Sequence, residues 1–318
     1  MVTRSVLSMS KRRERGKRVL RLLLVLGIAV TALIVGGRSE VFANPADRPF
    51  QLAMTSSVFT NVNENDIRAA LKVWVRTLAE KHGIQADPNP KVYRTVEDLM
   101  QFARTTPIDA LGITTPEYVI ASKEMAFDLF GTGATGGRIE VVYLLLVNQD
   151  SGIQRLDQLA GRSMNVLLNP RLSMAEIWLD TLLLEAKLKR TSDFLKKVTK
   201  ENKVSQVVLP VFFGAVDACL VTQDSFEVMC DLNPQLKKKL RILSSSPPLV
   251  PAGFAFLRDS ASPYRQQVIE VLATLQESPA GKQILELTQS ETIKVHSISC
   301  LDKSLELLKK HRRLLGNS

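Results

Sequence analysis

The chain of 318 residues contains little of what enzymes and metalloproteins commonly use for chemistry. It has three cysteines and three histidines, and no cysteine pair has the spacing of a metal site. The histidines, His82, His296 and His311, stand far apart along the chain. The sequence therefore indicates no metal site and no bound cofactor.

Catalytic motifs are also missing. The sequence has no G-x-S-x-G elbow, no P-loop, no H-E-x-x-H pair and no cysteine–histidine pair with an orienting group. Internal repeats and low-complexity segments are absent as well. We therefore predict a protein that binds without chemical conversion and has no catalytic residues. An enzyme on the same fold is the least favoured alternative.

The odd number of cysteines leaves at least one thiol free in an oxidising compartment. Cys219 lies in the apolar run Val216–Val221, so we expect a buried small hydrophobe. A disulfide between Cys219 and Cys230 is the less favoured alternative, and Cys300 has no obvious partner.

The net charge of +10 is concentrated at the N-terminus. Residues 1–43 carry nine lysines and arginines and two acidic residues, which leaves only +3 for the rest of the chain. The basic cluster Lys309–Arg313 fits the last turn of a helix, where cations complement the helix dipole. Because no basic stripe follows in the body, we predict no nucleic-acid partner.

The first 43 residues have the layout of a secretory signal peptide. The basic block Lys11–Arg18 precedes the apolar run Val19–Val35, and Val41-Phe42-Ala43 resembles a small-residue cleavage site. We predict export to the periplasm with cleavage after Ala43. Because the apolar run is long for a signal peptide, an uncleaved anchor in the inner membrane stays open as the second alternative.

The centre of the chain is the stretch Glu140–Pro170, which contains the apolar runs Val141–Val147 and Met164–Leu168. Such continuous runs are typical of strands buried on both faces of a sheet between helices. We expect the chain to enter a second lobe near Asn148 and to return near Leu243–Pro248. The predicted organisation is residues 44–145 for lobe 1, 146–245 for lobe 2, and 246–318 for the return to lobe 1 and the C-terminal helices, with a two-strand hinge.

Short apolar runs alternate with helical patterns in both predicted lobes, which is typical of doubly wound sheets. The predicted strands are Phe50–Met54, Val92–Tyr93, Ile108–Thr114, Phe194–Thr199, Ala215–Val221, Leu240–Leu243 and Ala252–Leu257. The predicted helices begin near Asn65, Thr95, Thr115, Ser173, Val204, Pro263, Pro279 and Leu301, and Pro210 is expected to bend or break the fifth of them. Leu240–Leu243 is interpreted as the start of the return.

The segment Gly131–Gly136 is a literal G-x-G-x-x-G motif. A dinucleotide loop would need a helix directly after it, but Arg138-Ile139-Glu140 and an apolar strand follow instead. We therefore predict a flexible turn at these glycines.

Four groups of residues resemble the periplasmic substrate-binding proteins of the phosphate/phosphonate class, which serve ATP-driven importers. They are Asp109–Thr114 with Tyr118-Val119, Asn148–Ile153 with Leu156–Leu159 and Gly161-Arg162, Gly214–Ala218, and Pro247–Pro251 with Phe254. The resemblance covers about residues 50–300. It implies an α/β fold of type II with two lobes and a ligand between them.

The same resemblance implies an exported solute-binding protein that captures a small oxyanion for an ABC importer. Its partners would be this ligand and a membrane permease, and we expect a monomer. The alternative is a membrane-tethered sensing module that signals to a receptor. Two segments depart from the family pattern: Asn169–Met174 has one hydroxyl, Ser173, in place of a cluster, and Lys200–Lys203 lacks a histidine.

Two physical rules select the candidate binding residues. Ligands of open α/β sheets lie beyond the carboxyl ends of the strands, and helix N-termini attract anions. These two rules, applied to the strand ends, the helix starts and the residues beside them, select Thr55, Ser56, Ser57, Thr114, Thr115, Tyr118, Asn169, Arg171, Ser173 and Thr222. Two helix starts, at Thr115 and Ser173, are expected to face the ligand from opposite lobes, and Arg171 could add a bidentate contact to an oxyanion.

Each candidate also has a structural interpretation. Thr115 and Ser173 could be simple N-caps, Arg171 could be a solvated loop charge, and Tyr118 could pack on the sheet. We expect Asp217 to hold a neighbouring loop, and Trp74 and Trp178 to lie in the core.

Overall fold

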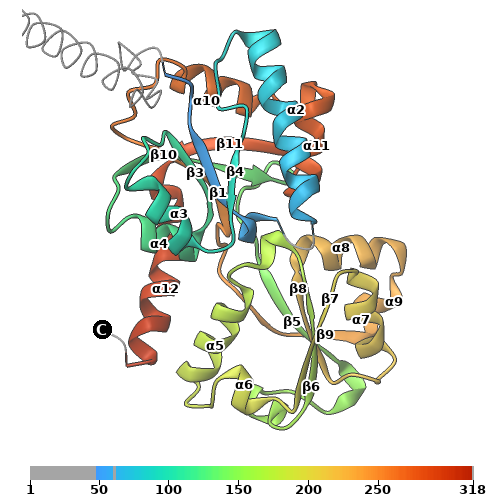
Figure 1. Cartoon of the computed structure of the whole chain (residues 1–318). Coiled ribbons are helices and arrows are strands. Elements are labelled where there is room, and N and C mark those ends of the chain that lie inside the picture. Colours follow the sequence, from blue (N-terminus) through green and yellow to red (C-terminus); the bar gives the residue numbers. More distant parts are fainter. Residues whose placement is uncertain (1–47, 60–61, 317–318) are drawn as a thin grey trace, which may run out of the picture. The chain divides into compact units, whose positions relative to one another are not determined.

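The computed structural model describes residues 48–59 and 62–316 (Figure 1). The predicted signal segment, residues 1–43, lies outside this part of the chain. Within the described residues, no helix combines the length and the apolar character needed to cross a membrane.

The first lobe is built on a six-stranded sheet with the strand order β11-β4-β10-β3-β1-β2. Strands β1, β2 and β3 are parallel, whereas β10 runs antiparallel to β3 and β4, and β11 antiparallel to β4. The strands are β1 (Leu52–Thr55), β2 (Lys91–Tyr93), β3 (Ala110–Thr114), β4 (Phe127–Ala134), β10 (Ala252–Leu257) and β11 (Thr292–Ser297).

Helices cover both faces of this sheet (Figure 1). One apolar cluster joins it to α2 (Glu64–His82), α10 (Arg265–Ala273) and α11 (Pro279–Leu287). A second cluster joins the opposite face to α3 (Val96–Ala103) and α4 (Thr115–Ala121). The predicted doubly wound arrangement is confirmed for this lobe, and Trp74 lies in its core as expected.

The second lobe has a five-stranded sheet with the order β7-β6-β8-β5-β9. Strand β6 is parallel to β7 and β8, and β5 is antiparallel to β8 and β9. The strands are β5 (Tyr143–Asn148), β6 (Ser163–Leu167), β7 (Lys197–Glu201), β8 (Ala218–Thr222) and β9 (Leu240–Ser245). The helices are α5 (Ala175–Glu185), α6 (Thr191–Phe194), α7 (Val204–Phe212), α8 (Gln223–Leu232) and α9 (Gln235–Lys239).

Asp217 and Trp178 have the structural roles that the sequence predicts in this lobe. The carboxylate of Asp217 accepts hydrogen bonds from the backbone N–H of Ser163 at 2.9 Å and from its hydroxyl at 2.6 Å. It thereby ties the start of β6 to the turn before β8. Trp178 is buried in the core.

The two chain crossings between the lobes lie side by side. The backbone groups of Val141 and Leu249 exchange two hydrogen bonds, of 2.7 and 3.0 Å, and the N–H of Ser246 donates to the carbonyl of Tyr143. The predicted two-strand connection is therefore present as a hydrogen-bonded pair.

A third link between the lobes is not covalent. The last helix, α12 (Asp302–Leu314), packs on α4 of the first lobe and on α5 of the second. The hydroxyl of Ser304 accepts from the N–H of Val250 and donates to its carbonyl, while Leu307 enters the core of the second lobe. Packing of α12 therefore joins the lobes in addition to the two crossings that the sequence predicts.

The glycine motif does not form the predicted flexible turn. Gly131 and Gly133 lie inside β4, and only Gly136, with a φ of 54°, is in a turn. A Cβ atom on Gly133 would stand 1.9 Å from the hydroxyl oxygen of Ser290, so the close approach of the neighbouring chain explains this glycine. Sequence alone places glycine outside strands, which is why the prediction failed.

Three further predictions of elements in the second lobe need correction. Leu240–Leu243 still belongs to the second lobe and does not yet return the chain to the first, because β9 forms the edge of the second sheet beside β5. Phe194 ends α6, and the strand begins only at Lys197. Its edge position and exposed side chains leave no apolar pattern to detect.

Helix α7 is continuous across Pro210. A proline at this position cannot donate to the carbonyl of Gln206. The side-chain amide of Asn165 donates to that carbonyl at 3.2 Å instead. This replacement lets the helix continue where the sequence predicts a bend or break.

A buried carboxylate anchors the start of the described chain. Asp109 is fully buried and receives both arms of the Arg48 guanidinium, at 2.6 and 2.7 Å. It also accepts from the N–H of Gln51 at 2.8 Å and from the hydroxyl of Ser260 at 2.6 Å. The segment before β1, the start of β3 and the loop after β10 therefore meet at one charge.

All three cysteines are free, and Cys219 is fully buried in β8 as predicted. Burial raises the pKa of the Cys219 thiol far above its usual value and that of Cys300 to about 11. Burial also raises the pKa of the Cys230 thiol, but this residue is only partly buried, so a thiol reagent should label Cys230 in the native protein and leave Cys219 unlabelled. Peptide mass spectrometry checks this, with denatured protein as the control. Equal labelling of the two residues, or a Cys219–Cys230 bridge, would contradict the structure.

Candidate functional site

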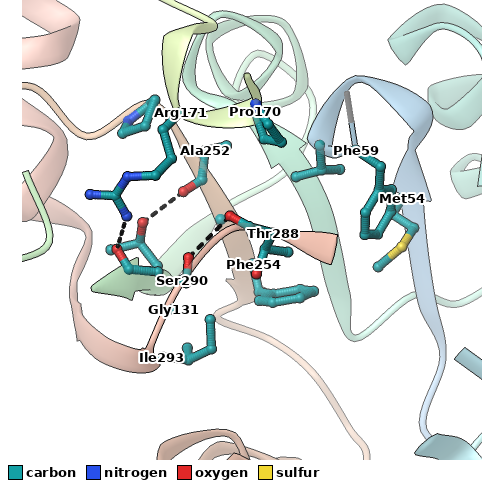
Figure 2. Close-up of a pocket in the computed structure, with 15 residues that line it drawn as sticks. Met54, Phe59, Gly131, Pro170, Arg171, Ala252, Phe254, Thr288, Ser290 and Ile293 are labelled. Carbon is teal, nitrogen blue, oxygen red and sulfur yellow. Dashed lines mark hydrogen bonds between the residues drawn. The ribbon is translucent and has the colours of Figure 1, made fainter. Parts of the chain in front are cut away.

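A small pocket lies where the first lobe meets the segment Pro170-Arg171 of the second (Figure 2). Its walls are mostly apolar side chains of the first lobe, including Met54, Phe59 and Phe254. The free space is about 40 Å³, which is room for roughly three water molecules. A ligand larger than that requires the walls of the pocket to move apart.

Arg171 is the only charged residue among those that line this pocket. Its side chain is 9% exposed. Nη1 donates a long hydrogen bond of 3.4 Å to the carbonyl of Gly133, and Nη2 has no hydrogen-bond partner among the described residues. Buried polar groups are nearly always paired, so an unused guanidinium N–H in a pocket points to a ligand.

The backbone around Arg171 is held from two directions. The side-chain oxygen of Asn169 accepts from the N–H of Arg171 at 2.8 Å, and the hydroxyl of Tyr143 donates to its carbonyl at 2.9 Å. Asn169 also donates through its amide to Gln289 of the first lobe. The short turn Pro170–Leu172 thus fixes the backbone of Arg171, and burial shows that the guanidinium is not a solvated loop charge.

Burial lowers the pKa of the Arg171 guanidinium, because removing a charge from water disfavours the charged form. The carboxylates of Asp224 and Glu291 oppose this shift, and the positive charge of Arg138 adds to it. Arginine nevertheless stays protonated at neutral pH. The pocket therefore offers one permanent, poorly solvated positive charge.

Thr115 and Ser173 are not the N-caps of the helices that the sequence predicts to begin at them, and neither residue lines this pocket. Helix α4 has Thr114 as its N-cap in a capping box with Glu117, and the N–H of Thr115 donates to the carbonyl of Pro251 at 2.8 Å. Helix α5 begins only at Ala175, and the hydroxyl of Ser173 donates to the same carbonyl at 2.8 Å.

These two hydroxyl residues hold the second crossing instead. Thr115 donates through its hydroxyl to the carbonyl of Val250 at 2.6 Å, next to the contact that Ser173 makes with Pro251. One residue comes from each lobe. Sequence patterns locate a capping residue only to within one or two positions, which was too coarse to separate these roles.

The other candidates are placed as follows. The hydroxyls of Thr55 and Thr114 both donate to the carboxylate of Glu117, and Thr222 is the N-cap of α8. Tyr118 is buried against Phe127 and Phe130 in the core. Ser56 and Ser57 begin the short turn that leads to Val58 and Phe59. Of the ten candidates, only Arg171 lines the pocket.

Sequence reasoning missed most of the pocket wall. Thr288 and Ser290 come from the segment that follows α11, and Ile293 from β11, a strand that the sequence did not predict. Gly131 and Gly133 come from β4. The G-x-G-x-x-G motif was the available signal, because glycines inside a strand often mark a close approach of ligand or chain.

The family described as "ABC transporter, phosphonate, periplasmic substrate-binding protein" matches residues 57–297. The chain belongs to this family. Membership in this phosphonate-binding family makes it the substrate-binding component of an ABC transporter, with a small-molecule ligand and a permease as partners, and confirms the resemblance seen in the sequence. The family is periplasmic. No curated protein matches the chain.

Solved structures share the fold at low sequence identity. A binding protein of an ABC phosphonate transporter from Pseudomonas aeruginosa is 14% identical, with a TM-score of 0.53 over 86% of this chain and 90% of that one. PhnD1 from Prochlorococcus marinus, solved with methylphosphonate, is 14% identical, with a TM-score of 0.53 over 86% of this chain and 100% of that one. A Xanthomonas citri protein solved with ATP is 16% identical, with a TM-score of 0.56 over 84% of this chain and 98% of that one. The predicted two-lobed type II fold is confirmed.

Proposed function

We propose that the chain captures a small oxyanion in the pocket at Arg171 and delivers it, unchanged, to the permease of its transporter. The carrying observation is the buried guanidinium with an unused Nη2 in a pocket between the lobes. Charged hydrogen bonds to oxyanions are among the strongest that a protein makes, and arginine suits their planar oxygen pairs. A relative with the same fold was solved with methylphosphonate, which supports an oxyanion ligand.

The proposal includes the form in which the protein works. We propose a periplasmic monomer that begins after Ala43 once the signal segment is removed, and that neither binds nucleic acid nor converts its ligand. The layout of residues 1–43 supports export and cleavage. The nearly balanced charge of the rest of the chain supports the lack of nucleic-acid binding, and the absence of catalytic motifs supports the lack of conversion.

A titration of the purified protein tests the function. Methylphosphonate, other phosphonates and inorganic phosphate are each added while thermal unfolding and heat of binding are recorded. A ligand at 100 times its Kd should stabilise the protein by about 2.7 kcal/mol. The ³¹P spectrum of the ligand released from the protein should be that of the starting compound. If no oxyanion shifts the melting temperature, or if the ligand is converted, the proposal fails.

A further inference from the structure

The pocket is divided into a charged side and an apolar side. The guanidinium of Arg171 lies beside Gly133, whereas Met54 and Phe59 stand across the pocket from it (Figure 2). Phe254 and Ile293 extend the apolar surface between them. A ligand that fills this space therefore meets a positive charge at one end and hydrocarbon at the other.

The hydroxyls that line the pocket have no proton to offer. Thr132 donates to the carbonyl of Ala252 at 2.7 Å, Ser290 donates to the carbonyl of Thr288 at 3.1 Å, and Thr288 donates back into α11. A hydroxyl carries only one proton, so these groups meet a ligand as acceptors. Among the lining side chains, Arg171 alone has an unused donor.

The charges near Arg171 also limit what can bind. Asp224 forms an ion pair with Arg138 at 2.7 Å. Glu291 accepts a hydrogen bond from the backbone N–H of Gly136 at 2.8 Å. Together with Arg171 these four groups sum to zero. A ligand with two negative charges would find one hydrogen-bonding cation and no surplus of positive charge, and leaving a charge unpaired in a buried site is costly.

We infer that the pocket selects small organic monoanions with one oxyacid group for Arg171 and one hydrocarbon substituent for the apolar side. The inference rests on the proposed function and narrows its ligand class. It excludes inorganic phosphate and the fully ionised phosphonates as the preferred ligands. The preferred length of the hydrocarbon substituent is then set by three apolar residues of the wall, Val58, Phe59 and Ile293.

A homologous series tests the apolar side. We expect the Kd to fall about fourfold for each methylene from methyl- to ethyl- to propylphosphonate, which is about sixteenfold in all. Inorganic phosphate should bind more weakly than any of them. Tighter binding of phosphate, or affinity that falls with chain length while Arg171→Met still weakens binding, would overturn the inference and leave the proposed function standing. If no anion binds, both fail.

A pair of ligands tests the charge. Propylphosphonate gains a second negative charge between about pH 6 and about pH 8.5, as phosphoryl groups lose their second proton in the neutral range, whereas propanesulfonate keeps one charge. We expect propylphosphonate to bind more weakly at the higher pH and propanesulfonate to change little. The sulfonate also reports any titration of the protein itself. Equal or tighter binding of the phosphonate at the higher pH, relative to the sulfonate, would overturn the inference.

Two matched valines test the wall. Val58 and Val75 are both buried in the same apolar cluster, but only Val58 lines this pocket. Val58→Thr keeps the side-chain shape and adds a polar group, so the gain from methyl- to propylphosphonate should drop from about sixteenfold to about fourfold. Val75→Thr should leave the gain unchanged. The same gain in both variants would remove Val58 from the selection.

Discussion

Arg171→Met is expected to weaken binding of the oxyanion ligand by about tenfold to hundredfold. A hydrogen bond to a charged group contributes about 1.5–3 kcal/mol, and methionine cannot replace it. The melting temperature of the unliganded protein should stay the same or rise. The reason is that Arg171 is buried with one long hydrogen bond and an unpaired amino group, and such a charge contributes little to folding. Calorimetric titration and thermal unfolding measure the two effects.

The matched control is Arg155→Met. Arg155 is an exposed arginine of the second lobe that pairs with Asp157 away from the pocket, so its removal should leave affinity unchanged. A drop in the melting temperature of Arg171→Met with unchanged affinity would show that Arg171 only supports the fold. Equal affinities of the wild type and Arg171→Met would remove Arg171 from the site.

Asp109→Ala should cost about 3–5 kcal/mol of the free energy of unfolding. The substitution leaves the Arg48 guanidinium without its bidentate partner and removes the acceptor of the Gln51 N–H and the Ser260 hydroxyl. Breaking one side of a buried ion pair is far more costly than losing an exposed one. Urea unfolding followed by circular dichroism measures the difference.

Asp157→Ala is the control for this second prediction. Its ion pair with Arg155 is exposed on both sides, so its loss should cost less than about 1 kcal/mol. The double variant Arg48→Ala/Asp109→Ala should be less destabilised than the two single losses added together, because neither charge is then left unpaired. A cost for Asp109→Ala no greater than that of Asp157→Ala would show that the carboxylate does not anchor the lobe.

Much of the fold could be predicted because it depends on local patterns. The apolar runs at Tyr143–Asn148 and Ala218–Thr222 are strands buried on both faces, and Trp74 and Trp178 stand on apolar helix faces. The same patterns misplace the start of β7 and miss β11, and both strands lie at sheet edges and keep exposed side chains. A strand with many solvent-exposed side chains has too few apolar residues for its sequence alone to predict it.

The site was harder to predict, since it depends on which acceptor each side-chain hydroxyl donates its hydrogen bond to. Thr115 and Ser173 have the residue types of anion-binding helix starts, but both donate to carbonyls of the crossing at Val250 and Pro251. Arg171 could be selected because it follows the carboxyl end of a predicted strand, where ligands of open α/β sheets bind. Gly133 and Ser290 meet only through the pairing of two strands that lie far apart in sequence, and no local pattern contains that contact.

Helix α12 determines when the protein can finish folding. Leu301 belongs to the core of the first lobe and Leu307 to the core of the second, so each core needs residues from the last eighteen of the chain. The apolar interior of each lobe is therefore incomplete before this part of the chain has been made. Contacts between such distant segments form late and slowly. Both lobes should therefore complete their folding only after α12 has been made.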